Sequence, residues 1–594
     1  MRDRLQTYVR ASLTWLKSHP HHVVAGVLLA IWCIPYFVTG NNVEWGDFTF
    51  FAQGAEAIRN SILAYHQFPW WNPWVAGGVP LYANPQFGVF SLQTLFGLFF
   101  GAVAGLKITA AIFTVGGYAS MFILARRYFK ISAKIAAVIA LLWVFNSFFV
   151  SHIPSHFTFL WYFLAPLFVY LSLTVKNWRG GLALGGLFTL MGLAEIHYSF
   201  LHIAIICAII LVVRLVRGKT SRKQLALGLL AAAAFFVVIA GHRALFTLQN
   251  VHDFPRIVAD PPAKPWDSIL AVTLPFFGAH KAPYPYPNTP FGWGETTATF
   301  GLCASIALAL LIGWLLYRWR HKPKIKETKE LRYGAGLLGV AIAAFAIGVG
   351  AVVKIAPYSL IKHLPILSGM RVASRWFIWY ELAALLFMGY MLWRIRPSRL
   401  RTVAKAFLVL GVAELFVLGF GYQFMLFGHK AVTAPKPITA YQFEQGNMFG
   451  DTRYLPTGDK LPDDGNMPHV DREYEATTFN LGTIQANDAL VDLRGLKTPP
   501  HCTYAQGCPF VLSGNAKLMS WSPNKVVLMR TGVGPIRLNM NDSNYFTVNG
   551  VRSTAKHVAE PYGDLTITLP DSTQNITIEV QPSASVTIKG LLTK

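Results

Sequence analysis

The sequence predicts an α-helical polytopic membrane protein with a C-terminal all-β domain. Of its 594 residues, only 13% are charged and 53% are hydrophobic, whereas soluble domains average about 25% charged residues. Apolar runs near the length that crosses a bilayer recur as far as residue 425. Beyond residue 430, short runs alternate apolar and polar residues, which is typical of half-buried strands.

Eleven apolar runs of suitable length are predicted to span the bilayer. They cover residues 23–40, 106–125, 135–151, 157–175, 180–196, 198–213, 224–241, 297–317, 333–353, 372–393 and 403–425. The run 88–105 is also apolar, but a span there would move the basic residues of 126–134 to the outer side. We therefore expect 88–105 to be a re-entrant or interfacial segment.

The net charge of +24 is sorted by loop along the chain. With the N-terminus inside, every dense basic cluster of the membrane part falls on the cytoplasmic side, as the positive-inside rule requires. These clusters lie in 2–17, 126–134, 176–179, 214–223, 318–332 and 394–405. The charge is thus explained by topology, and no nucleic-acid partner is predicted. The odd number of spans places the C-terminal domain outside the cytoplasm.

The same topology gathers the polar residues near the membrane on the outer face. Ionisable groups at this depth are costly and usually functional. They are Glu44 and Asp47 in the first loop, His152 and His156, Glu195 and His197, His242, Arg243 and Glu295 in loop 242–296, and Arg371 with Arg375. Glu381 and Glu414 lie deeper in the last two spans, where interhelical hydrogen bonds are the expected role.

Asp47 is the acid best placed for chemistry. It precedes an amphipathic run, 48–58, that favours an interfacial helix. Asp is a good helix N-cap, so a capping role is one interpretation. A general base in a wet loop at the bilayer surface is the other. Glu44 is the second candidate acid of this loop.

Arg371 and Arg375 are spaced i, i+4 at the start of a span and share one face. On the outer side they oppose the positive-inside bias, so they need another explanation. Guanidinium groups match phosphate in bidentate geometry, which favours a lipid phosphate. An internal ion pair is the alternative. Arg243 is a third cation that could add to such a site.

A metal site is only weakly indicated. His152 and His156 are spaced i, i+4, but Pro154 disfavours a regular helix between them. No His-Glu-x-x-His pattern is present. We name no metal ligands and no certain cofactor, and a divalent cation stays open as an alternative.

The segment 67–80 is rich in Trp, Pro and Gly. Trp71 and Asn72 are candidates for contact with a sugar. Interfacial anchoring is the favoured interpretation of Trp70, Trp71 and Trp74, because Trp is enriched at the membrane surface.

The C-terminal region divides into a linker, 430–475, and a β domain, 476–594. Strands are predicted at 526–529, 565–569 and 576–580, with turn signals such as Asn549-Gly550 between them. This domain could bind a glycan acceptor or act as a lid or assembly surface. Cys502 and Cys508 could form a disulfide in an oxidising compartment.

These motifs resemble those of YfhO-type bacterial membrane proteins, relatives of the GT-C glycosyltransferases. Gly46-Asp47 and the segment 71–86 are similar to the acidic site and the Trp-Asn-Pro…Gly-Gly…Asn-Pro-Gln segment of that family. The stretch 364–376 resembles its Arg-x-Pro-x-Arg motif, with Ala373 in place of Pro. A weaker similarity is at 544–550. The resemblance implies a GT-C-like fold, a polyprenyl-phosphate sugar donor and an inverting transfer outside the cytoplasm.

The prediction is therefore a glycosyltransferase of the inner membrane, with a glycan or lipid acceptor and the bilayer as its partners. Asp47 is the expected general base, supported by Glu44. The donor phosphate would bind Arg371, Arg375 and Arg243. The substrate-binding candidates are His156, Glu195, His197, Glu295, Trp71 and Asn72.

Two non-enzymatic functions are alternatives. A flippase or transporter of lipid-linked sugars should show inverted repeats and broken helices near mid-membrane, which the sequence does not. An envelope-assembly scaffold would leave the outer acids and arginines unexplained. A nucleotide-driven pump is disfavoured, because the chain has no Gly-x-x-x-x-Gly-Lys-Ser/Thr motif.

Overall fold

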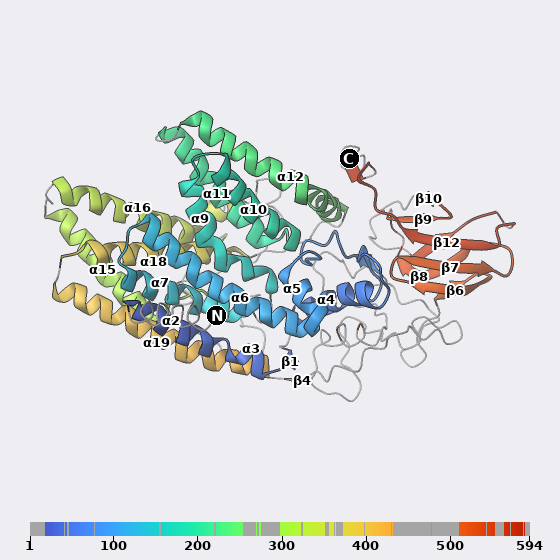
Figure 1. Ribbon diagram of the computed structural model, residues 1–594, viewed down its shortest axis with the longest axis horizontal. Helices are drawn as coiled ribbons and strands as arrows, with labels where there is room; N and C mark the ends of the chain where they lie inside the picture. Colours follow the sequence, from blue (N-terminus) through green and yellow to red (C-terminus); the bar gives the residue numbers. More distant parts are fainter. Residues whose placement is uncertain are drawn as a thin grey trace, which may run out of the picture.

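The fold is described from a computed structural model of the chain (Figure 1). The structure describes residues 18–40, 42–43, 47–75, 78–153, 156–218, 221–253, 269, 272–274, 297–321, 325–350, 356–361, 363, 372–396, 398–428, 430–431, 474, 477, 510–541, 543, 545–552, 564–570, 572–585 and 587–588. Glu44, Glu295, Arg371, Cys502 and Cys508 lie outside these ranges, as does nearly all of the predicted linker 430–475.

Helices make up one end of the molecule and strands the other (Figure 1). The helical part comprises α2 (Pro20–Trp32), α3 (Ile34–Val38), α4 (Asp47–Leu63), α5 (Leu92–Phe100), α6 (Ala102–Ile123), η1 (Leu124–Tyr128), α7 (Ala133–Phe145), α8 (Ser147–His152), η2 (Phe157–Leu164), α9 (Ala165–Thr174), α10 (Trp178–Ala194), α11 (Tyr198–Arg217), α12 (Arg222–Asp253), α15 (Leu302–Arg320), α16 (Ile325–Gly348), α17 (Pro357–Ile361), η4 (Ala373–Trp376), α18 (Phe377–Arg394) and α19 (Arg399–Gly428).

The predicted multi-pass helical architecture is confirmed. Within the described residues, ten helical segments of at least 18 residues are apolar enough to cross a membrane. The eleventh predicted span corresponds to α10, whose 17 residues fall just below that length. The run 88–105 contains the nine-residue helix α5, which is too short to cross about 30 Å of hydrocarbon. The expectation that this run does not span is therefore confirmed.

One predicted span differs in its local geometry. Residues 157–175 do not form a single α-helix: η2 is a 3₁₀ helix, and the α-helix α9 starts after it. Pro166 stands in the first turn of α9, where its missing N–H costs nothing. In an α-helix that continued from η2, the same residue would lack a hydrogen bond and clash with the preceding turn.

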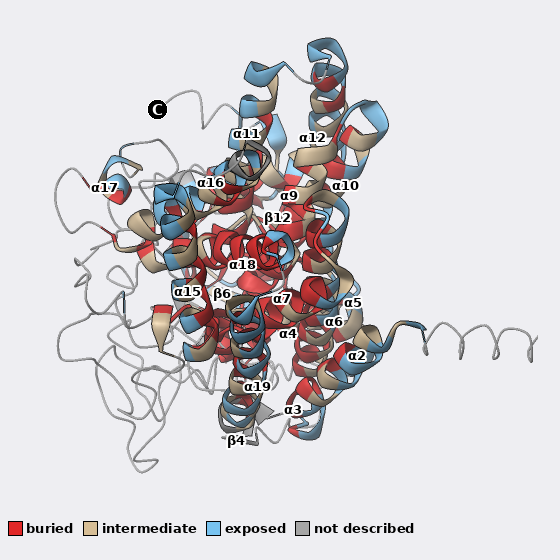
Figure 2. Cartoon of the chain, turned by 90° about the vertical axis from the view of Figure 1, so that its left-hand side faces the viewer, coloured by how far each residue is buried: buried red, intermediate tan, exposed pale blue. Residues whose placement is uncertain are grey.

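The centre of the bundle is formed by α7 and α18, which are buried on nearly all sides (Figure 2). Peripheral helices turn apolar side chains outward; Val238 of α12 is 80% exposed and Val417 of α19 is 67% exposed. An all-round apolar helix belongs in a core, whereas exposed apolar stripes suit helices solvated by lipid.

The two deep glutamates behave differently. The Glu414 carboxylate of α19 accepts hydrogen bonds from the backbone N–H groups of Leu302 and Cys303, each at 2.9 Å. It caps α15 from a neighbouring helix, so the expected interhelical role is confirmed. The carboxyl oxygens of Glu381 are buried and make no hydrogen bond to another described residue. The same expectation is therefore wrong for Glu381 within that part of the chain.

The predicted C-terminal β region is also confirmed. One antiparallel sheet has the strand order β10-β9-β12-β7-β6, and a second has the order β11-β8-β5. Val526, Leu528, Ile576 and Ile578 alternate with more exposed neighbours and form part of the core. The strands are β5 (Val511–Ser513), β6 (Ala516–Ser522), β7 (Lys525–Arg530), β8 (Ile536–Asn541), β9 (Phe546–Val548), β10 (Val551–Arg552), β11 (Asp564–Ile567) and β12 (Asn575–Val580).

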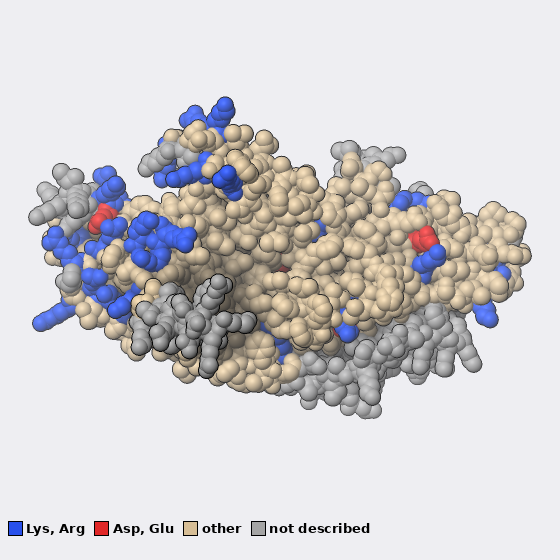
Figure 3. Space-filling view, in the orientation of Figure 1, with Lys and Arg blue, Asp and Glu red and all other residues tan. Residues whose placement is uncertain are grey.

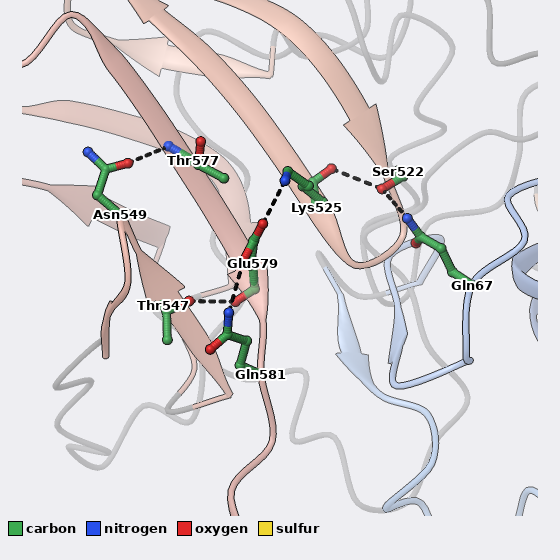
Figure 4. Close-up of polar contacts among 8 residues, drawn as sticks. All are labelled: Gln67, Ser522, Lys525, Thr547, Asn549, Thr577, Glu579 and Gln581. Carbon is green, nitrogen blue, oxygen red and sulfur yellow. Dashed lines mark hydrogen bonds and ion pairs between the residues drawn. The ribbon is translucent and has the colours of Figure 1, made fainter.

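Side-chain contacts reinforce the larger sheet (Figure 4). Lys525 and Glu579 form an ion pair of 2.7 Å between β7 and β12. The Asn549 side chain accepts a hydrogen bond of 2.7 Å from the backbone N–H of Thr577. Asn549 has φ +49°, a left-handed conformation that Asn tolerates, and it begins the predicted Asn-Gly turn between β9 and β10.

Two short antiparallel pairs organise the connections. In the first, β1 (Asn42–Val43) pairs with β4 (Lys430–Ala431), which joins the start of the first loop to the chain just beyond α19. In the second, β2 (Trp71–Asn72) pairs with β3 (Val79–Pro80) inside the aromatic segment. The first loop is therefore a folded unit.

The basic residues gather at the end of the bundle that lies away from the β strands (Figure 3). If that end is cytoplasmic, as the positive-inside rule requires, the β domain lies outside. We expect topology reporters fused at Lys430 and Lys594 to read extracytoplasmic and one fused at Lys324 to read cytoplasmic. A cytoplasmic signal at Lys594 would reverse the orientation and remove the argument for an external site.

Candidate functional site

The helix α4 leads from the first loop into the bundle, and Asp47 is its first residue. Phe48 packs edge-on against Phe157 of η2, with 5.1 Å between ring centroids. One turn further on, Phe51 lies 6.2 Å from the ring of His156. The start of α4 therefore lies against the start of η2, near one of the predicted substrate-binding histidines.

Arg375 of η4 is buried among aromatic rings. Its guanidinium lies 4.2 Å from the ring centroid of Tyr198 and 4.8 Å from that of Phe159. These rings in turn contact two predicted site residues: His197 is 4.4 Å from Tyr198, and His156 is 5.1 Å from Phe159. Two aromatic side chains thus join Arg375 to both histidines.

Glu195 lies in the turn between α10 and α11 and is 3% exposed. The Ser199 hydroxyl donates to its carboxyl group and also lies 2.8 Å from the Thr158 carbonyl oxygen of η2. Burial raises the pKa of Glu195 well above its usual value of 4.5, although the Ser199 hydrogen bond and the Arg243 charge act in the opposite direction. The environment therefore favours the neutral carboxyl group, which can donate a hydrogen bond.

Sequence reasoning missed the polar residues just below Glu195. His202 hydrogen-bonds the Tyr162 hydroxyl at 2.7 Å, and its ring lies 4.3 Å from that of Trp376. Ser199 and His202 are three residues apart in α11, which places them on one helical face. This spacing is visible in the sequence, but neutral Ser and His side chains in an apolar run do not by themselves indicate a functional site.

Arg243 of α12 is fully buried. Its guanidinium donates to the backbone carbonyl oxygens of Leu193, Asn84 and Phe87. Leu193 belongs to the end of α10, and the other two belong to the segment 67–88 that follows α4, which we call the first outer segment after its predicted topology. The observed contacts make Arg243 a clamp between these segments, whereas the sequence suggested a phosphate ligand.

The aromatic segment is also placed differently from the favoured prediction. Trp71 and Trp74 are 2% and 1% exposed. The Trp71 ring packs against Phe546, and Trp74 faces Trp521, with centroids 4.8 Å and 6.3 Å apart. The membrane-anchor interpretation is therefore wrong for these two rings, which pack against the β domain. Asn72 is buried and bonded to Gln53 of α4.

The structure thus brings together Arg375, Glu195, His156 and His197, with the start of α4 beside them. Arg243 contacts the backbone beside this group at Leu193, whereas Trp71 contacts the β domain and Asn72 contacts α4. Among the described residues, no three His, Cys, Asp or Glu side chains lie together in a way that could hold a metal ion. The arrangement offers one buried cation, one buried carboxyl group and aromatic walls.

Solved structures similar to this chain include the following two. One is an oligosaccharyltransferase from Archaeoglobus fulgidus, with 14% identity and a TM-score of 0.39, aligned over 80% of this chain and 65% of that one. The other is ArnT from Cupriavidus metallidurans, with 12% identity and a TM-score of 0.42, aligned over 81% and 87% of the two chains. The chain thus covers less than two thirds of the oligosaccharyltransferase. Likeness at these scores carries no argument about activity.

No protein-family model matches the chain, and no curated protein matches it.

The raised pKa of Glu195 predicts a pH-dependent contribution to stability. Below pH 4.5 the carboxyl group is neutral in both the folded and unfolded states, and its favourable contribution is complete. As the pH rises through the folded-state pKa, burial of the charge removes this contribution. We expect Glu195→Gln, which stays neutral, to gain thermal stability relative to the parent protein between about pH 5 and pH 8.

Unfolding temperatures measured across this range test the prediction. Glu330→Gln is a matched control, because Glu330 is partly exposed and forms an ion pair with Arg394. If the unfolding temperatures of the parent protein and Glu195→Gln changed in parallel with pH, the pKa of Glu195 would not be raised in the folded protein.

Proposed function

We propose that the chain is an integral membrane glycosyltransferase that moves a sugar from a polyprenyl-phosphate donor to an extracytoplasmic glycan or lipid acceptor, with inversion. We place it in the inner membrane, with its site at the bundle end nearest the β domain. The observation that carries the proposal is the cluster of Arg375 and Glu195 at neighbouring helix ends. Burying both groups at this depth is costly, so they are expected to serve a ligand.

The phosphate would be held by Arg375 with Arg371. Arginine matches phosphate geometry and stays charged when dehydrated. The aromatic faces of Tyr198 and Phe159 exclude water from the guanidinium, and exclusion of water strengthens its attraction for an anion. When the bond from the anomeric carbon to the phosphate oxygen breaks, the phosphate keeps the electron pair, and the arginines stabilise that charge.

The nucleophile would be a hydroxyl group of the acceptor. Its oxygen forms the new bond to the anomeric carbon while Asp47 takes its proton, which balances the step. Glu195, neutral and buried, would donate a hydrogen bond to a sugar hydroxyl, with His156 and His197 beside it. Glu44 is a second candidate for the catalytic carboxylate, and Glu295 is a candidate for substrate binding.

Arg243 is assigned a different role from the one that its sequence position suggested. Because both of its terminal guanidinium nitrogens donate to carbonyl oxygens, we place it among the positioning residues. Trp71 and Asn72 are assigned in the same way, as supports of the first outer segment and α4.

The two arginines should therefore respond differently to substitution. We expect Arg375→Ala to weaken binding of undecaprenyl phosphate by about 1.5–3 kcal/mol, the usual loss for a charge-assisted hydrogen bond. Arg243→Ala leaves buried carbonyl groups unsatisfied, so it should mainly destabilise the fold, by about 3 kcal/mol or more.

Lipid-binding affinity and unfolding temperature of purified protein separate the two effects. Arg179→Ala, at an exposed position at the start of α10, is the control for loss of a surface charge. Unchanged lipid affinity in Arg375→Ala would show that this residue serves packing or an internal ion pair.

The role of Asp47 is tested by Asp47→Asn, because Asn caps a helix about as well as Asp but is not a base. If Asp47 is the base, the variant should fold, still bind donor and lose transfer by on the order of 10²–10⁴-fold. The assay follows transfer of labelled sugar from polyprenyl-phosphate donors. Near-normal transfer would move the base to Glu44 or Glu295. Donor binding by the parent protein without any transfer would favour the lipid-sugar flippase.

A further inference from the structure

The first outer segment, residues 67–88, is held by the β domain along one stretch. The Gln67 side chain donates to the Ser522 hydroxyl at 2.8 Å (Figure 4) and accepts from the backbone N–H of Asn524 at 3.1 Å. The Asn524 side chain donates to the Phe68 carbonyl oxygen at 2.6 Å. These bonds tie the hairpin between β6 and β7 to the start of the segment.

A second set of contacts holds the middle of the segment. The Asn541 side chain of β8 donates to the Gly78 carbonyl oxygen at 2.7 Å. Gly78 has φ +102°, and a Cβ atom there would lie 2.4 Å from the Trp71 indole nitrogen. Only glycine fits this approach. Trp71 itself packs against Phe546 of β9. The β domain thus contacts the backbone of the segment at a point that admits little rearrangement.

The chain before the β strands also reaches α4. Gln53 of α4 donates to the Thr477 hydroxyl at 3.0 Å and exchanges hydrogen bonds with the Asn72 side chain. Asn60 donates to the Thr477 carbonyl oxygen at 3.1 Å. Gln53, Asn72 and Thr477 are all fully buried. Buried amides that satisfy one another specify one arrangement of the three elements.

The far end of the same segment is held by the candidate site. Arg243 donates to the carbonyl oxygens of Asn84 and Phe87. The backbone N–H of Ile196, next to Glu195, donates to the Pro85 carbonyl oxygen at 2.9 Å. Gly88 packs so closely that a Cβ atom would lie 2.3 Å from the Ala194 carbonyl oxygen. Contacts to its described residues therefore hold the segment to the β domain at one end and to the turn that carries Glu195 at the other.

From this continuity, we propose that the C-terminal β domain is a positioning domain for the transferase site, with Asn524 and Asn541 as its positioning residues. Docking of the domain holds the first outer segment in the place where Arg243 can clamp it to the Glu195 turn. The inference rests on the proposed function only for the identity of the ligand at the site. The contacts are directional hydrogen bonds to backbone groups, which set position more strictly than apolar contact.

The test uses full-length protein in lipid nanodiscs. Asn524→Ala and Asn541→Ala each remove one side chain that bonds the segment. Asn575→Ala is the matched control, because Asn575 is exposed at the start of β12 in the same domain. Hydrogen exchange is measured in segment 67–88, in α4 and in the turn 193–197. Binding of undecaprenyl phosphate is measured in parallel.

We expect both variants to raise hydrogen exchange in the segment, in α4 and in the turn 193–197, while Asn575→Ala changes none of them. Lipid affinity should fall about three- to tenfold, the equivalent of one lost hydrogen bond. Faster exchange confined to the segment and the β domain, with unchanged lipid affinity, would overturn the proposal, because a purely local role predicts that result.

Two further measurements cover the cases in which the asparagine variants do not fold or the parent protein does not bind the lipid. If the asparagine variants fail to fold, Ser522→Ala removes the milder contact to Gln67, and Ser522→Thr should restore it. If the parent protein binds no undecaprenyl phosphate, the proposed donor is wrong. The exchange in the turn 193–197 still decides whether the β domain positions the site.

Discussion

The buried guanidinium of Arg243 is the interaction on which the functional end of the molecule depends. Its hydrogen bonds to Leu193, Asn84 and Phe87 connect α12, α10 and the first outer segment at one point. A buried charge without partners costs several kcal/mol, and so do carbonyl groups cut off from water. The charge and the three carbonyl groups therefore stabilise one another only in this arrangement. The position of the Glu195 turn follows from it.

Around Arg375 and Glu195, exclusion of water changes the electrostatic properties of the two side chains. Arg375 rests on aromatic faces and Glu195 is almost fully buried. In such surroundings a guanidinium attracts an anion more strongly than it would in water. A buried carboxyl group tends to keep its proton and can act as a hydrogen-bond donor. The structure thus pairs a buried cation with a buried carboxyl group, and the proposed transfer assigns the first to phosphate and the second to a sugar hydroxyl.

The β domain holds the first outer segment at the end opposite to the Arg243 clamp. Its asparagines and aromatic rings contact the stretch that is bounded at its other end by the Arg243 clamp. Because contacts hold this segment at both ends, a displacement at one end is transmitted to the other. This explains why a Trp-rich segment beside a membrane is buried: its rings fill the joint between the two domains.

The sequence by itself determined the helical spans, their order and the β character of the C-terminal region. Lipid and core packing select for apolar length and alternation, and these are visible residue by residue. The sequence also predicted that four polar residues lie on the same side, because each is at the outer end of a predicted span: Arg375, Glu195, His156 and His197. Only the tertiary structure decided that Arg243 binds carbonyl groups and that Trp71 faces Phe546. Backbone carbonyls are common to every residue type, and contacts between distant segments depend on how the domains pack, so no local pattern could reveal either partner.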